Sequence, residues 1–146
     1  HDCACNGLSP GFWRNWRNRF DEAAMDDLLQ STFVDSVYQL DYILAEPWDA
    51  NTNVARKFKG FLVTHQLTIA LTLSQYPKYD GYLLRTCAIN GQALGGVLDD
   101  QLEVIDLLMS GYTVDDAVLL AGSNLLATYV PQRANPKPDQ CQPDQC

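Results

Sequence analysis

Apolar residues recur every three or four positions through much of the chain, which is the spacing of amphipathic helices. Between residues 20 and 30, Phe20, Ala24 and Leu28 share one face, and acidic residues stand at the start, where a helix dipole favours them. The clearest pattern runs from about residue 53 to residue 75. Its apolar stripe comprises Phe58, Leu62, His65, Ile69 and Leu73.

Two more helices are predicted later in the chain, over residues 97–111 and 113–130. The apolar face of the first is expected to comprise Leu98, Leu102, Ile105 and Met109. That of the second is expected to comprise Val114, Val118, Ala121 and Leu125. Gly111 is a suitable C-terminal cap, and Thr113 with Asp116 resembles a capping box. Only a few residues separate these helices, so we expect an antiparallel hairpin.

The remaining segments complete the fold prediction. Residues 31–47 fit a helix or a strand, and glycines mark turns between residues 79 and 96. The sequence therefore predicts a single all-α domain of about four to six helices over residues 20–130. It is preceded by an irregular Cys- and Trp-rich N-terminal segment, 1–19, and followed by an extended Pro-rich C-terminal arm, 131–146. In a polyproline-like state this arm would reach on the order of 50 Å.

Charge and hydropathy narrow the classes of function. The 146 residues carry 18 acidic and 10 basic side chains, a net charge of −8. Nucleic acid is an unsuitable partner, because phosphate binding needs clustered Lys and Arg. The longest apolar run, Phe61 to Leu73, is too short to span a bilayer and fits a core helix. The one basic cluster, Ala55 to Gly60, is either a solvated helix end or a docking patch for the acidic face of another copy.

The positions of the five cysteines indicate disulfides and secretion. Cys3, Cys5, Cys141 and Cys146 lie close to the two ends, where they bury little surface, and no C-x-x-C zinc spacing occurs. A first residue His1 in place of Met also fits a processed, secreted chain. Three pairings remain open. In the first, Cys3 and Cys5 form disulfides with Cys141 and Cys146 of the next copy. In the second, the same four cysteines form disulfides within one chain. In the third, Cys5 pairs with Cys87, and Cys3 and the tail cysteines form other bonds. In the first two, Cys87 is a free thiol.

Near the N-terminus, GLSPG around Ser9 fits the G-x-S-x-G pattern of serine hydrolases. The residue after the nucleophile normally donates its backbone N–H to the oxyanion hole, but here it is Pro10, which has none. No strand is predicted before Ser9 either, so the motif indicates a tight turn. This turn brings aromatic residues back onto the domain. They form either a plug in the core or a stacking platform for a ligand: Phe12, Trp13 and Trp16.

The two histidines are the candidate metal ligands. His65 lies on the apolar stripe of the long predicted helix, where a core histidine is the simpler interpretation. If His1 is the mature N-terminus, its α-amine and imidazole could chelate copper with His65 as a third nitrogen ligand. No other cofactor is indicated.

The segment from Cys5 to Asn15, CNGLSPGFWRN, resembles a signature of secreted bacterial and archaeal proteins, C-x-[GL]-[ST]-P-G-[FY]-W-[KR]-x-H. The resemblance covers about ten residues and implies a small extracellular helical domain whose family has largely unassigned activity. The histidine usual in that family is replaced here by Trp16.

These observations favour a secreted structural subunit rather than an enzyme. We expect it to assemble with copies of itself into an extracellular filament or surface layer, with disulfides from the terminal cysteines. Subunits joined head to tail form contacts that propagate instead of closing. The alternative is an extracellular metal- or small-ligand-binding module that uses His1 and His65 with Trp13 and Trp16.

Overall fold

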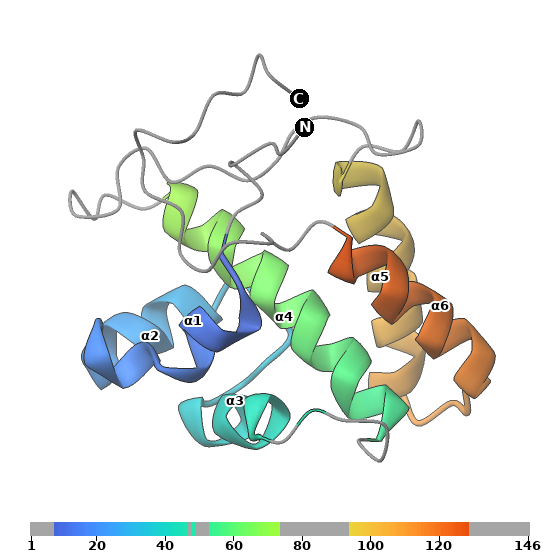
Figure 1. Cartoon of the computed structure of the whole chain (residues 1–146), viewed down its shortest axis with the longest axis horizontal. Helices are drawn as coiled ribbons and strands as arrows, with labels where there is room; N and C mark the ends of the chain where they lie inside the picture. Colours follow the sequence, from blue (N-terminus) through green and yellow to red (C-terminus); the bar gives the residue numbers. More distant parts are fainter. Residues whose placement is uncertain (1–7, 47, 49–52, 74–93, 129–146) are drawn as a thin grey trace.

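A computed structural model describes residues 8–46, 48, 53–73 and 94–128 of the chain. Within these residues the structure is all-helical and contains no strand, as the sequence predicts (Figure 1). The helices are α1 (Pro10–Arg14), the 3-10 helix η1 (Trp16–Asn18), α2 (Glu22–Leu29), α3 (Val37–Leu44), α4 (Val54–Leu73), α5 (Leu94–Met109) and α6 (Asp116–Ala127).

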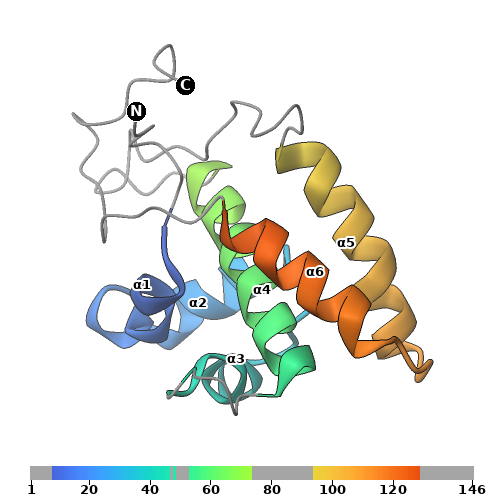
Figure 2. The ribbon, with the colours of Figure 1, turned by 45° about the vertical axis from the view of Figure 1, so that its right-hand side comes forward.

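Helix α4 is the centre of the fold. Figures 1 and 2 show α1, α2 and α3 on one side of it and α5 and α6 on the other. On the first side, Val63, Leu67 and Leu71 pack into a cluster with the N-terminal helices. On the second, Phe58 and Leu62 pack with α5 and α6. Helix α4 thus has buried apolar residues on two opposite faces, one for each side of the fold.

The predicted stripe on α4 is therefore one of two. Phe58, Leu62 and His65 are buried as expected, and Ile69 is half-buried. The second stripe, formed by Val63, Leu67 and Leu71, lies on the opposite side, against α1–α3.

The described part of the N-terminal segment is helical, so the prediction of an irregular segment over residues 1–19 is wrong from Pro10 to Asn18. Ser9 caps α1, because its Oγ accepts a hydrogen bond from the N–H of Phe12. Pro10 then occupies the first helical position, where its missing N–H has no cost. The turn predicted from Ser-Pro-Gly is thus the first turn of a short helix.

Residues 31–47, for which helix and strand were both open, form helix α3 between residues 37 and 44. The Ser36 hydroxyl caps α3 by accepting a hydrogen bond from the N–H of Gln39, 3.2 Å away. Two arginines hold its C-terminal end. Arg14 Nε donates to the carbonyl of Leu44, and Arg56 Nη1 donates to that of Tyr42. Cations at this end also suit the helix dipole.

The chain reverses direction between α5 and α6, which contact each other as a hairpin (Figure 1). Gly111 ends α5 with a positive φ of 86°, as its prediction as a cap requires. The N–H groups of Gly111 and Tyr112 bond back to the carbonyls of Leu108 and Leu107. The predicted cap at Thr113 is wrong, because α6 begins two residues later, after an N-cap at Asp115.

The buried faces of α5 and α6 differ from those predicted. On α5, Leu98 and Ile105 are buried, but Leu102 and Met109 are exposed. On α6, Val118 and Ala121 are exposed, and the buried residues are Leu119, Gly122, Ser123 and Leu126. The reason is the small size of Gly122, which lets α6 approach α4 closely. A Cβ there would lie 2.8 Å from Cε1 of Phe58.

None of the helices in the described ranges is long and apolar enough to cross a membrane. Several predictions concern residues outside those ranges. They are the roles of His1 and of all five cysteines, Cys3, Cys5, Cys87, Cys141 and Cys146, and the extended arm 131–146.

Candidate functional site

The turn at Ser9 has a structural role. Its hydroxyl oxygen lies 3.2 Å from the N–H of Phe12 and accepts the hydrogen bond that starts α1. The following residue, Pro10, has no N–H to offer an oxyanion. The local geometry is therefore that of a helix cap and provides no nucleophile elbow.

The three N-terminal aromatic residues Phe12, Trp13 and Trp16 are all buried in the cluster on the α1–α3 side of α4. Trp13 stacks on Phe20 with 5.9 Å between ring centroids and meets the edge of Phe12 at 5.0 Å. Its Nε1 donates to Oγ1 of Thr68 on α4, 3.1 Å away. Because Trp13 is fully buried and its ring contacts are with the chain itself, the geometry fits a core plug and leaves no ligand-stacking platform.

Trp16 belongs to a small polar network at the edge of this plug. Its Nε1 donates to Oδ1 of Asp41 on α3 at 3.1 Å, and Arg17 forms an ion pair with the same carboxylate at 2.7 Å. Partial burial alone would raise the pKa of Asp41, but the hydrogen bonds from Arg17 and Trp16 outweigh it and lower that pKa. The network fixes η1 to α3.

His65 is fully buried between α4 and α6. Its Nε2 lies 2.9 Å from the carbonyl oxygen of Leu126, so Nε2 carries the proton and donates. Burial lowers the pKa of the imidazole to about 4, although the hydrogen bond to Leu126 acts in the opposite direction. A neutral imidazole at physiological pH follows.

A copper ligand role for His65 would have to use Nδ1, which has no hydrogen-bond partner in the described structure. The second proposed ligand, His1, lies outside the described residues. Within those residues, no group of three or more His, Cys, Asp or Glu side chains is placed to hold a metal ion. The observed contact instead joins the end of α6 to the central helix.

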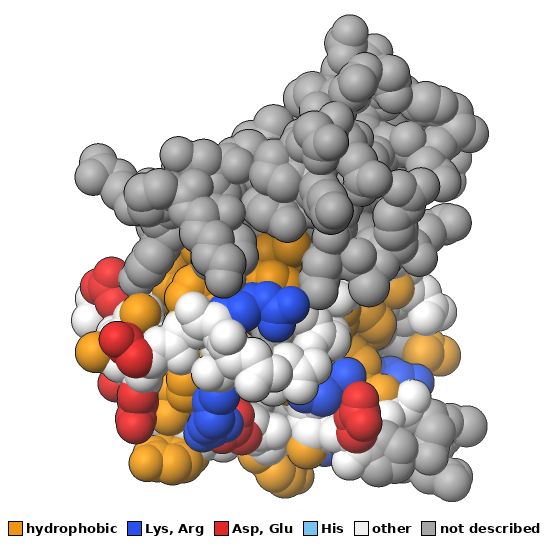
Figure 3. Space-filling model, turned by 60° about the vertical axis from the view of Figure 1, so that its left-hand side comes forward, with side chains coloured by type: hydrophobic (Ala, Val, Ile, Leu, Met, Phe, Trp, Pro, Cys, Tyr) orange, Lys and Arg blue, Asp and Glu red, His pale blue; other side chains and the backbone are white. Residues whose placement is uncertain are grey.

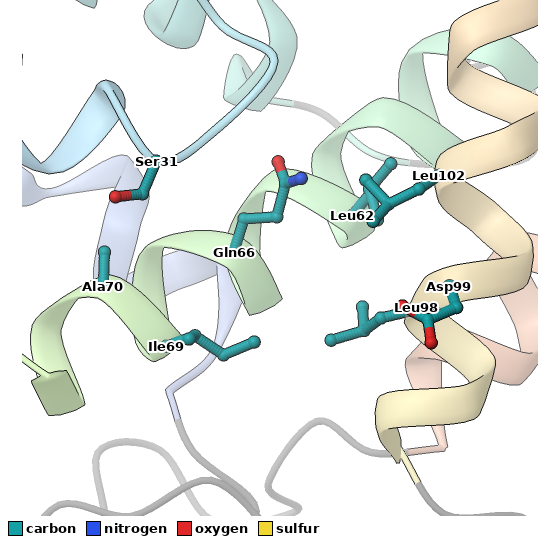
Figure 4. Close-up of a pocket in the computed structure, with 8 residues that line it drawn as sticks. All are labelled: Ser31, Leu62, Gln66, Ile69, Ala70, Leu98, Asp99 and Leu102. Atoms are coloured by element: carbon teal, nitrogen blue, oxygen red, sulfur yellow. The ribbon is translucent and has the colours of Figure 1, made fainter.

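A pocket of about 330 Å³ opens between α4, α5 and the turn after α2 (Figure 4). Ile69 of α4 and Leu98 of α5 extend toward each other across it. The polar groups beside it are Asp99, Ser31 and Gln66, whose Oε1 accepts a hydrogen bond from the N–H of Phe33. Its other lining residues are Leu62, Ala70 and Leu102.

A second hollow, of about 430 Å³, is a groove between α5 and α6, named here the α5–α6 groove. It exists because the buried face of α6 is turned away from the predicted one. Val118, Ala121 and Leu125, expected in the core, line the groove together with Val104 of α5. Asp100 lies on its α5 side.

The described parts of the chain differ in the signs of charge they carry. Helices α5 and α6 and their connection carry only acidic charges, at Asp99, Asp100, Glu103, Asp106, Asp115 and Asp116. All described Lys and Arg residues precede Gly60: Arg14, Arg17, Arg19, Arg56, Lys57 and Lys59. Figure 3 shows Lys and Arg side chains interspersed with Asp and Glu side chains on the face that it presents. Residues 94–128 therefore carry acidic charge alone, whereas the described residues before Gly60 carry both signs.

Sequence reasoning missed the pocket and the α5–α6 groove. Both depend on which face of α5 and α6 is buried, and apolar residues occur on several faces of these helices. Residues 94–128 contain acidic but no basic side chains. This signal was visible in the sequence and could have identified α5 and α6 as a candidate interaction surface.

No protein-family model, curated protein sequence or solved structure is significantly similar to this chain.

Proposed function

We propose that this chain is a secreted, non-enzymatic structural subunit that assembles with copies of itself into an extracellular filament or surface layer. The observation that carries the proposal is that six of the eight large apolar side chains exposed in the described ranges lie on α5, α6 and their connection. Exposed apolar surface concentrated on one part of a protein marks an interaction site. The exposed residues are Leu102, Leu107, Met109, Tyr112, Val118 and Leu120.

Two features of the sequence support this function. Cys3 and Cys5 stand near one end and Cys141 and Cys146 near the other, so disulfides between successive subunits would join head to tail. The resemblance of residues 5–15 to secreted proteins supports the oxidising location that such bonds require.

Gel electrophoresis of the native full chain, with free thiols blocked beforehand, tests the covalent part of the proposal. We expect a ladder of multiples without reductant that collapses on reduction to one band at 16.3 kDa. A single monomer band in both lanes would show that disulfides do not join subunits. Cys5→Ser with Cys87→Ser is an informative variant, because it removes the Cys5–Cys87 pairing while leaving Cys3 and the tail cysteines intact.

The pocket between α4 and α5 favours a second candidate function, the binding of a small apolar ligand. It differs from the module predicted at the sequence level, because Trp13 and Trp16 are buried elsewhere. An apolar fluorescent dye titrated into the full chain tests it. Binding should weaken in Ile69→Trp, which fills the pocket, and persist in Ala121→Trp, whose site lies on the α5–α6 groove. Equal binding to both variants would contradict the assignment.

A further inference from the structure

The structure carries two surfaces whose chemistry is complementary. One is the α5–α6 groove, whose apolar lining lies among exclusively acidic charges. The other is named here the tyrosine face. It consists of Tyr38 and Tyr42, which are 70% and 69% exposed on α3, together with Arg56 and Lys59 of α4.

The tyrosine face has the features of an anchor for a protein contact. Tyr38 and Tyr42 are four residues apart, so both project from the same side of α3. Tyrosine supplies a large, rigid contact area with a polar tip, and such side chains are enriched among interface hot spots. The chain fixes this helix well, because Arg14 and Arg56 bind its C-terminal carbonyls and Ser36 caps its start.

Positive charge lies beside Tyr42. The guanidinium carbon of Arg56 lies 5.8 Å from the centre of the Tyr42 ring, and Lys59 joins Tyr42 around the same shallow hollow. Arg17 is paired with Asp41, which stands between Tyr38 and Tyr42 along α3.

The α5–α6 groove has the opposite character. Its floor includes Val104, Val118 and Leu125, which suit the body of an aromatic ring. Asp100 lies on its α5 side, and residues 94–128 contain five further carboxylates and no Lys or Arg. An aromatic side chain with positive charge beside it suits this groove, because the ring can pack against the apolar lining and its neighbouring charge is opposite to that of the carboxylates.

A single molecule does not bring the two surfaces together. Figures 1 and 2 place α3 and the α5–α6 hairpin on different sides of α4. A second copy can supply the tyrosine face, and its own groove then remains open for a third copy. Contacts between two different patches build open chains or rings rather than closed two-fold dimers.

We infer that the tyrosine face of one copy docks in the α5–α6 groove of the next, and that this non-covalent contact sets the head-to-tail order of the assembly. The inference rests on the proposed self-assembly and names the surfaces that perform it. Disulfides between the terminal cysteines would then secure neighbours already placed by this contact.

The test measures association of the full chain by sedimentation equilibrium in reducing buffer, where disulfides cannot contribute. Two variants each remove one surface. Tyr38→Ala with Tyr42→Ala removes the anchor, and Ala121→Arg blocks the groove with a long cation at an exposed helical position. Gln30→Ala is the control, since this residue is exposed at the end of α2 and belongs to neither surface.

We expect each surface variant to raise the dissociation constant of the wild-type chain about tenfold or more, and the control to leave it within about twofold. Mixing the two surface variants is the decisive step. One retains the groove and the other the tyrosine face, so the mixture should form a one-to-one complex that grows no further.

Three results would overturn the inference: a monomeric wild-type chain in reducing buffer, surface variants that associate like the control, or a mixture without the one-to-one complex. The first also separates this inference from the proposed function. A chain that is monomeric when reduced but forms a ladder when oxidised retains self-assembly without this contact. A chain that is monomeric in both buffers contradicts both proposals.

Discussion

At the scale of single residues, His65 links the stability of the fold to pH. The pKa of its imidazole is about 4 in the folded chain, below the ordinary histidine value of 6.5. Between these values the unfolded chain binds the additional proton, so the free energy of unfolding rises with pH. The contribution is complete above about pH 6.5 and is lost as the pH falls toward 4, with a total on the order of 3 kcal/mol.

His65→Gln tests this prediction, because the glutamine amide keeps a donor for the Leu126 carbonyl but does not titrate. Urea denaturation at pH 7 and pH 5 should show a larger loss of stability for the wild-type chain than for the variant. Equal losses would show that carboxylates elsewhere account for the whole pH dependence.

A second residue-scale prediction concerns the carboxylate of Asp41. Asp41→Ala should reduce the free energy of unfolding by about 1–3 kcal/mol, because it leaves the buried Nε1 of Trp16 without its acceptor. Asp41→Asn keeps an oxygen for Trp16 and loses only the ion pair with the half-exposed Arg17, which costs about 1 kcal/mol or less. Urea denaturation compares the two, and an equal cost would contradict the role of the Trp16 hydrogen bond.

At the scale of helices, two glycines form a matched pair. Gly122→Ala places a Cβ 2.8 Å from the Phe58 ring and should force α6 away from α4, at a cost of about 1–3 kcal/mol. Gly96→Ala in α5 meets no atom within 4 Å and should stabilise the helix by up to about 1 kcal/mol. Thermal unfolding of both variants provides the comparison. A stabilised Gly122→Ala variant would show that the α4–α6 contact is looser than described.

The same contact explains which parts of the fold were predictable. Periodicity located α4 and α5 and the Gly111 cap, because these depend on local spacing and backbone geometry. It gave the wrong face for α6, because Leu119 and Leu126 compete with Val118 and Leu125 and the small residues Gly122 and Ser123 decide the outcome. Close approach to a helix distant in sequence has no local signature. The α5–α6 groove could not be predicted for this reason, whereas a core plug of Phe12, Trp13 and Trp16 was one of the two interpretations that the sequence left open.

At the scale of the whole molecule, the acidic charge of α5 and α6 and the basic residues beside Tyr42 give a prediction about salt. Raising the ionic strength from about 0.05 M to about 0.5 M shortens the range of electrostatic interactions from about 14 Å to about 4 Å. Association in reducing buffer should therefore weaken severalfold, since the acidic groove and the basic residues beside the tyrosines attract each other less. Light scattering at fixed protein concentration measures this, and association unaffected by salt would contradict the charge complementarity.

The central claim is that this chain assembles with copies of itself, and sedimentation velocity of the full wild-type chain in oxidising buffer tests it most directly. The account predicts a series of species that extends to larger sizes as the protein concentration rises, without a limiting dimer. A single species of 16.3 kDa at every concentration would contradict it.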